Sequence, residues 1–180
     1  ADVAMYQAKS AGRNTARFFD PVMQAAAATH AAMAQEIKVG IERNEFVLHY
    51  QVQIDARGHC TGAEALVRWN HRVRGLVSPA HFIPLAEETG MILPLGYWVL
   101  DSACQQLAAW SRNPATAHWT LAVNVSAAQL AQPGFVESVK KALLHSQAPA
   151  TQLKLELTES MLANDVEGII TKMMDIKALG

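Results

Sequence analysis

The chain has 180 residues, of which 51% are hydrophobic and 17% charged, proportions typical of a folded globular protein and not of a disordered one. The formal net charge is -1 and no basic run occurs, which argues against nucleic acid as a partner. The two cysteines, Cys60 and Cys104, are far apart, which excludes a disulfide framework or zinc spacing and predicts reduced core residues of a cytoplasmic protein.

The longest apolar run covers residues 91–100 and is interrupted by proline and glycine. It is too short to span a bilayer, so we expect no membrane segment in this part of the protein. No signal peptide is recognisable, and residue 1 already lies within a helical pattern. We therefore expect the chain to be part of a larger polypeptide.

Two helices are predicted before residue 44. The first covers about residues 1–11, with Gly12 as its C-cap. Asp20 and Pro21 then combine an N-cap with a proline at the first helical position, which starts a helix running to about Arg43. Its apolar stripe fits either a signalling connector between domains or a helix that caps a core, and the sequence favours neither.

Strands and helices alternate over the rest of the chain. Residues 46–54 and 60–69 read as two strands about a short turn, which predicts a hairpin. Ser78 and Pro79 start a helix that Gly90 ends. The remaining predicted elements are a helix over 97–110, a strand over 119–125, a helix over 133–146, a strand over 153–157 and a helix over 166–179. This alternation predicts βαβ units and a parallel sheet.

The strand over 60–69 carries two charged side chains on one face. Strand side chains alternate between faces, so Glu64 and Arg68 point the same way. They lie about 13 Å apart along a strand that rises about 3.3 Å per residue, and so cannot pair with each other. Because unpaired buried charge is costly, each needs a partner, either an ion or ligand from outside or another part of the fold.

Two later strands repeat this feature. Alternation places Asn124 and Glu156 on the face that carries Glu64, at or near the carboxyl ends of their strands, where active sites of parallel α/β barrels assemble. All three side chains offer oxygen, which suits Mg²⁺ or Mn²⁺ and argues against zinc. A structural hydrogen bond explains any one of them alone, whereas the convergence of three favours a metal site.

Residues 64–69, Glu-Ala-Leu-Val-Arg-Trp, resemble the signature of EAL domains, the bacterial cyclic di-GMP phosphodiesterases. Further stretches resemble the same family in its order and spacing, at residues 50–51, 75–79, 82–87, 124–126 and 156–160. Residues 1–9 and 12–14 resemble the closing helix of a GGDEF domain. The expected organisation is a GGDEF remnant over 1–20, a connecting helix over 21–43, and the N-terminal half of an EAL domain over 44–180.

The resemblance implies an α/β fold, a modified TIM (βα)8 barrel whose first strand is antiparallel, with about the first half present. It implies hydrolysis of cyclic di-GMP to linear pGpG with Mg²⁺ or Mn²⁺ as cofactor. Other implied partners are a second copy of the domain in a homodimer, an upstream GGDEF domain and upstream sensory domains.

The resemblance also assigns roles to individual residues. Glu64, Asn124 and Glu156 match the family's metal ligands, and Glu159 matches the glutamate that holds the loop between active site and dimer interface. The expected catalytic residues are thus Glu64, Glu156 and Glu159. Arg68 matches a residue that contacts a substrate phosphate, and Gln51 one that contacts the nucleotide.

The chain departs from the family pattern in two places. Val52 stands where the family usually has proline, a change expected to have little effect. The family's Asp-Asp-Phe-Gly motif, its later lysine and its later glutamate would all follow Gly180. We therefore expect the 180 residues alone to be catalytically incomplete and not a stable monomer. The alternative function is a receptor that binds cyclic di-GMP without hydrolysing it.

Overall fold

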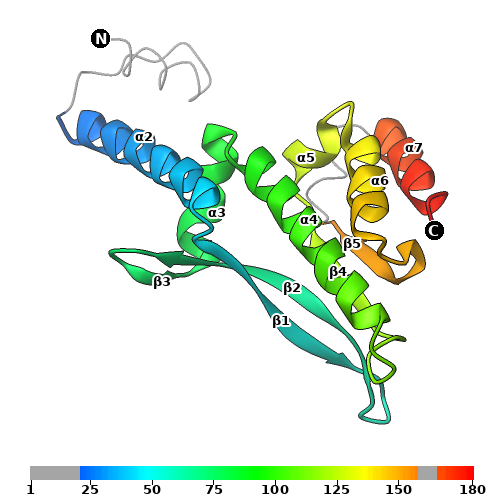
Figure 1. Cartoon of the computed structure of the whole chain (residues 1–180). Helices are drawn as coiled ribbons and strands as arrows, with labels where there is room; N and C mark the ends of the chain where they lie inside the picture. The colour runs from blue at the N-terminus through cyan, green and yellow to red at the C-terminus, as the bar shows by residue number, and fades with distance from the viewer. Residues whose placement is uncertain (1–20, 158–165) are drawn as a thin grey trace.

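The computed structural model describes residues 21–157 and 166–180 and has mixed α/β architecture (Figure 1). The principal strands form one sheet in the order β1-β2-β4-β5, and β3 pairs with the end of β2. The strands are β1 (Phe46–Ile54), β2 (Cys60–His71), β3 (Gly75–Val77), β4 (Thr120–Asn124) and β5 (Leu153–Glu156). β1 runs antiparallel to β2, whereas β2, β4 and β5 are parallel, so the expected antiparallel first strand and the hairpin are confirmed.

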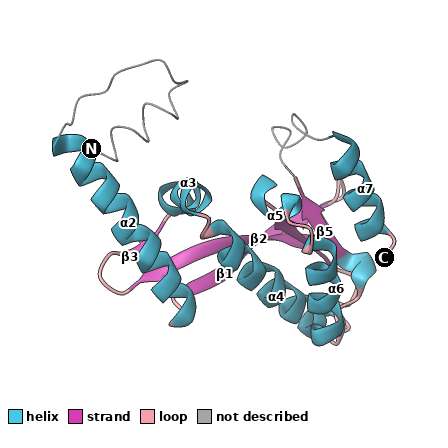
Figure 2. Cartoon of the chain, turned by 90° about the horizontal axis from the view of Figure 1, so that it is seen from above, coloured by secondary structure: helices cyan, strands magenta, loops and turns pink. Residues whose placement is uncertain are grey.

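Helices connect and cover these strands. They are α2 (Pro21–Glu42), α3 (Pro79–Thr89), α4 (Ile92–Ser111), α5 (Ala127–Ala131), α6 (Phe135–Ser146) and α7 (Val166–Lys177), with a 3-10 turn at Ala150–Gln152. α4 runs along the strands, and α6 and α7 lie side by side next to β5 (Figures 1 and 2). The helix predicted over residues 1–11 lies outside the described residues.

Several elements differ from the sequence prediction. α4 begins at Ile92 instead of residue 97, because Pro94 falls in the first turn, where a missing N–H breaks no helical hydrogen bond. The segment before α6 contains a separate short helix, α5, and α6 itself begins at Phe135. The three-residue strand β3 was not predicted, since so short a segment has no readable alternation.

Two clusters of buried side chains form the core. The larger lies between the sheet and helices α4 and α6, and includes Leu107, Leu121, Val123, Phe135 and Val139. Cys104 lies in this cluster and is buried and free, as predicted. Its burial, and to a smaller extent the nearby charge of Asp101, raises the pKa of its thiol to about 12. Cys60 is also free but only half-buried, so it is not the core residue that was expected.

The smaller cluster joins α2 to the end of β2. Trp69 is 0% exposed and stacks on Phe46 with ring centroids 5.1 Å apart, and the edge of Phe82 meets it at 5.7 Å. Ile37 of α2 is also 0% exposed in this cluster. Gly40 permits the close approach, because a Cβ there would lie 3.0 Å from the Trp69 ring nitrogen. The C-terminal half of α2 thus caps a core, which is one of its two predicted roles.

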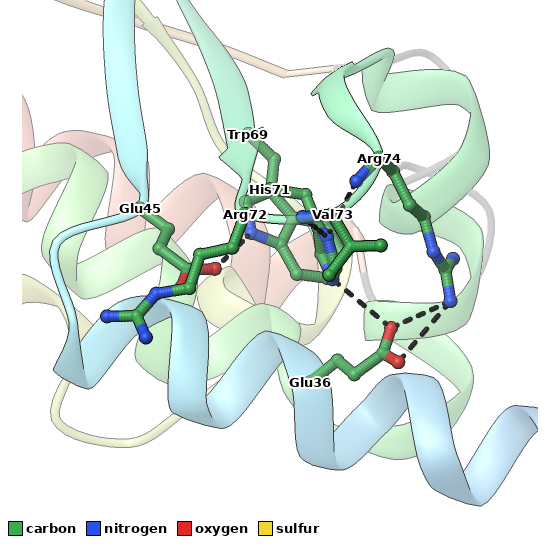
Figure 3. Close-up of polar contacts among 7 residues, drawn as sticks. All are labelled: Glu36, Glu45, Trp69, His71, Arg72, Val73 and Arg74. Carbon is green, nitrogen blue, oxygen red and sulfur yellow. Dashed lines mark hydrogen bonds and ion pairs between the residues drawn. The ribbon is translucent and has the colours of Figure 1, made fainter.

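Polar contacts surround this packing (Figure 3). Glu36 of α2 faces the β2–β3 turn, with its Oε2 3.0 Å from Nη2 of Arg74 and 3.6 Å from Nε2 of His71. Glu45 accepts a hydrogen bond from the ring N–H of Trp69 at 3.2 Å and pairs with Nε of Arg72 at 2.9 Å. Because most of these groups are partly exposed, they set the orientation of α2 more than they add stability.

The close contact between β2 and β4 can be tested at Gly62 of β2. This residue lies opposite Thr120 of β4, and a Cβ at Gly62 would overlap the Thr120 carbonyl oxygen. We expect Gly62→Ala to lower the free energy of unfolding by about 1–3 kcal/mol, because β2 and β4 must separate to admit the methyl group. Urea unfolding of the full-length protein, the polypeptide as it occurs in the cell, measures this free energy. Hydrogen exchange of peptides from β2 and β4 shows where the structure has loosened.

Gly134→Ala is the matched control, because a Cβ at Gly134 has no neighbour within 4 Å. An unfolding midpoint for Gly62→Ala equal to that of Gly134→Ala would contradict the close contact of β2 with β4.

Within residues 21–157 and 166–180, no helix has the length and hydropathy needed to cross a bilayer.

Candidate functional site

The predicted oxygen ligands lie on one face of the sheet, at or near its carboxyl edge. Asn124 and Glu156 are direct neighbours in the parallel β4–β5 register. Glu64 of β2 pairs with Ala122, which lies two residues before Asn124 on β4. Asn124 and Glu156 are exposed and Glu64 is half-buried. The register therefore brings together three side chains that are separated by long stretches of sequence.

A short hydrogen bond joins two of them. Nδ2 of Asn124 donates to Oε1 of Glu64 at 2.6 Å. Since the amide nitrogen is directed at Glu64, the amide oxygen of Asn124 is turned elsewhere. Within the described residues, neither that oxygen nor the carboxylate of Glu156 has a hydrogen-bond partner. The site thus keeps acceptor oxygens available at its open side.

The donor set fits a hard divalent cation. Two carboxylates and one amide carbonyl are ligands that Mg²⁺ and Mn²⁺ favour. In the part of the chain that the structure describes, no three His, Cys, Asp or Glu side chains gather closely enough to hold a metal. The Glu64, Asn124 and Glu156 set contains only two such residues, so a further acidic ligand would strengthen it.

The two expected substrate contacts flank this set. Gln51 of β1 pairs in register with Glu64, and its side chain is exposed on the same face. Arg68 is half-buried further along β2, where its Nη1 donates to the Val67 carbonyl at 2.9 Å. Among the described residues Arg68 has no carboxylate partner, so most of its donors remain available to an anion.

A cavity of about 560 Å³ opens beside residues 65–68 of β2 and the carboxyl end of β4. Arg68 and Asn124 line it on the strand side, and most of its remaining wall is apolar. Residues from the helices complete the wall, among them Pro79, Ile83, Glu87, Leu95, Val99 and Gln129. The cavity therefore places an apolar surface next to the Arg68 guanidinium and one predicted metal ligand, Asn124.

Sequence reasoning missed Gln129, which is 3% exposed and lines this cavity. The signal was present, because Ser126 and Gln129 have the spacing of a capping box, and the structure forms that box at the start of α5. Glu159, the remaining predicted site residue, lies outside the described residues, as does the stretch resembling a GGDEF domain.

Comparison with known proteins identifies the family to which the sequence of this chain is similar. The EAL domain model matches residues 34–180. The bifunctional diguanylate cyclase/cyclic di-GMP phosphodiesterase MucR of Pseudomonas aeruginosa is 42% identical over 181 residues, which cover 100% of this chain and 26% of MucR. The cyclic di-GMP phosphodiesterase PdeR of Escherichia coli is 36% identical over 180 residues, 100% of this chain and 27% of PdeR.

Solved structures agree with this match. The phosphodiesterase of PaMucR in complex with c-di-GMP superposes with a TM-score of 0.79 at 41% identity, covering 83% of this chain and 60% of that one. The EAL enzyme Bd1971 in its cGMP-bound form gives a TM-score of 0.79 at 26% identity, covering 87% of this chain and 44% of that one. The chain thus corresponds to part of an EAL domain, and the expected partial barrel is confirmed.

Proposed function

Because this chain belongs to the EAL domain family, we propose that it supplies the metal-binding half of a cyclic di-GMP phosphodiesterase active site. The observation that carries the proposal is the meeting of Glu64, Asn124 and Glu156 on adjacent parallel strands, with Asn124 bonded to Glu64 at 2.6 Å. MucR and PdeR, which match the whole chain, are both named as cyclic di-GMP phosphodiesterases. The proposed reaction adds water across one phosphodiester bond and releases linear pGpG.

Glu64, Asn124 and Glu156 would hold Mg²⁺ or Mn²⁺. When bound, such an ion supplies Lewis-acid activation of the phosphodiester and of water. The Asn124–Glu64 bond fixes both side chains before the ion arrives, which reduces the ordering cost of binding. The paired aspartates implied by the family resemblance are proposed to complete the ligand set from further along the polypeptide.

Arg68 and Gln51 would position the substrate. The guanidinium of Arg68 presents parallel N–H groups that match two oxygens of one phosphate. The apolar wall of the adjoining cavity suits the flat face of a base, so one nucleotide unit fits with its phosphate toward Arg68. Gln51 stands beside Glu64 on β1 and offers an amide to the same ligand.

Regulation is proposed to reach this site from outside the domain. The name of MucR joins a cyclase and a phosphodiesterase. In the sequence of this chain, α2 directly follows the stretch that resembles a GGDEF domain. The proposed partners are therefore an upstream GGDEF domain and a second copy of the EAL domain.

Arg68→Lys tests the proposed substrate contact. We expect the KM for cyclic di-GMP to rise roughly tenfold with little change in kcat, because lysine keeps the charge but loses the two-pronged contact. Steady-state hydrolysis by the full-length protein measures both constants. Arg57→Lys, at an exposed turn, is the control. A KM for Arg68→Lys within twofold of that of Arg57→Lys would show that Arg68 does not contact the substrate.

A further inference from the structure

Gln129 is a buried polar side chain whose role the proposed chemistry leaves unexplained. It is 3% exposed, on the short helix α5 beside α4 (Figure 1). A buried amide is costly unless its polar atoms are bonded. Its Oε1 accepts hydrogen bonds from both the backbone N–H and the hydroxyl of Ser126, each at 3.1 Å. The amide thus closes the turn between β4 and α5.

The bonding is reciprocal. The hydroxyl oxygen of Ser126 accepts the backbone N–H of Gln129 at 3.3 Å, which completes the capping box. α5 has only five residues, too few for a helix to be stable by its own hydrogen bonds. The geometry of the turn therefore depends on this pair of side chains.

Gly96 of α4 provides the seat for the amide. A Cβ at Gly96 would overlap the terminal amide atoms of Gln129. A glycine inside a helix costs about 0.5–1 kcal/mol relative to alanine, so its place in α4 calls for a reason. The reason is that the Gln129 amide occupies the space that a Cβ at this residue would fill.

The turn leads directly to the site. Asn124 precedes Ser126 by two residues, and between them the N–H of Val125 donates to the Glu156 carbonyl at 2.9 Å. A displaced Ser126 would shift the end of β4, and with it the amide that bonds to Glu64. The Asn124 side chain has no other hydrogen-bond partner among the described residues, so its position follows that of the backbone.

We propose that Gln129, seated on Gly96, is a positioning residue that holds Asn124 where it can join Glu64 and Glu156 in binding a divalent cation. The reason for holding Asn124 in this position rests on the proposed function. The positioning role concerns cation affinity, however, which can be measured without turnover.

A double-mutant cycle tests the proposal on the full-length protein. The variants are Gly96→Ala, Gln129→Ala and the two combined, and the measured quantity is the Kd for Mn²⁺ by isothermal titration calorimetry. Each single variant is expected to raise this Kd about tenfold, because Gly96→Ala displaces the amide that Gln129→Ala removes. The combined variant is expected to match Gln129→Ala alone, since residues that act through one contact are not additive.

Two further variants keep the test decisive. Ser126→Ala removes one side of the capping box without placing atoms in the core, and is expected to raise the Mn²⁺ Kd about threefold even if Gly96→Ala fails to fold. Gly134→Ala, which meets no neighbouring atom, is expected to leave the Kd unchanged.

Unchanged Mn²⁺ affinity in Gln129→Ala and Ser126→Ala, or strictly additive effects in the cycle, would overturn the proposal. So would a wild-type protein that does not bind Mn²⁺. A protein that binds Mn²⁺ and shows the expected cycle, yet produces no pGpG, would support the positioning role while refuting the proposed function. General misfolding would instead lower the fraction of protein that binds Mn²⁺, which the same titration reports as its stoichiometry.

Discussion

Replacing Glu64 with glutamine is expected to reduce hydrolysis of cyclic di-GMP by the full-length protein about 10²- to 10³-fold. That range corresponds to the loss of about 3–4 kcal/mol of transition-state stabilisation, comparable to removing one preorganised electrostatic group from an active site. Glutamine has the volume of glutamate and keeps a carbonyl oxygen for the Asn124 amide, which now donates at 2.6 Å. The substitution therefore removes the negative charge and little else. The measurement is pGpG release, with the unfolding midpoint followed in parallel.

Glu137→Gln is the control for this prediction. Glu137 is an exposed carboxylate in the first turn of α6, so its loss removes the same charge at another place. It should leave the rate within twofold of wild type. A Glu64→Gln protein that retains more than about a third of wild-type activity would show that the carboxylate is not part of the reacting site.

Trp69→Ala is expected to cause the largest loss of stability, about 3–5 kcal/mol in the free energy of unfolding. The ring is fully buried between Phe46 and Phe82, and Gly40 of α2 lies against its nitrogen. Truncation opens a cavity that α2, α3 and the sheet all border. Since native domains are stable by about 5–15 kcal/mol, a loss of this size strongly increases the unfolded fraction. Urea unfolding measures this loss of stability, and hydrogen exchange of β2 peptides locates it.

Trp69→Phe separates packing from hydrogen bonding. Phenylalanine keeps an aromatic ring against Phe46 but cannot donate to Glu45, so we expect a smaller loss of about 1–2 kcal/mol. Equal losses for the alanine and phenylalanine variants would mean that the Glu45 hydrogen bond dominates. A loss below about 1 kcal/mol for Trp69→Ala would contradict the packing of α2 and α3 on this ring.

The sequence predicts much of this architecture because local patterns determine it. Alternation along each strand places Glu64 on one face and Trp69 on the other, and the structure agrees. Proline at a helix start and glycine at a helix end mark α3, where Gly90 has a φ of 75°. The same parity argument predicts that Asn124 and Glu156 face the way Glu64 does.

Other features depend on contacts between distant residues and are not readable from local patterns. The Asn124–Glu64 bond joins residues 60 positions apart and depends on the register of β2 with β4. The seat of Gln129 on Gly96 depends on how α5 lies against α4. A glycine inside a helix lowers its intrinsic stability, and only the packed structure identifies the side chain that requires Gly96.

The most direct test of the account is product analysis after the full-length protein is incubated with cyclic di-GMP, with and without Mn²⁺. The account predicts linear pGpG that accumulates only with the metal and is nearly lost in Glu64→Gln. A protein that binds both Mn²⁺ and cyclic di-GMP yet leaves the cyclic dinucleotide intact would contradict it, and would identify a receptor built on the same site.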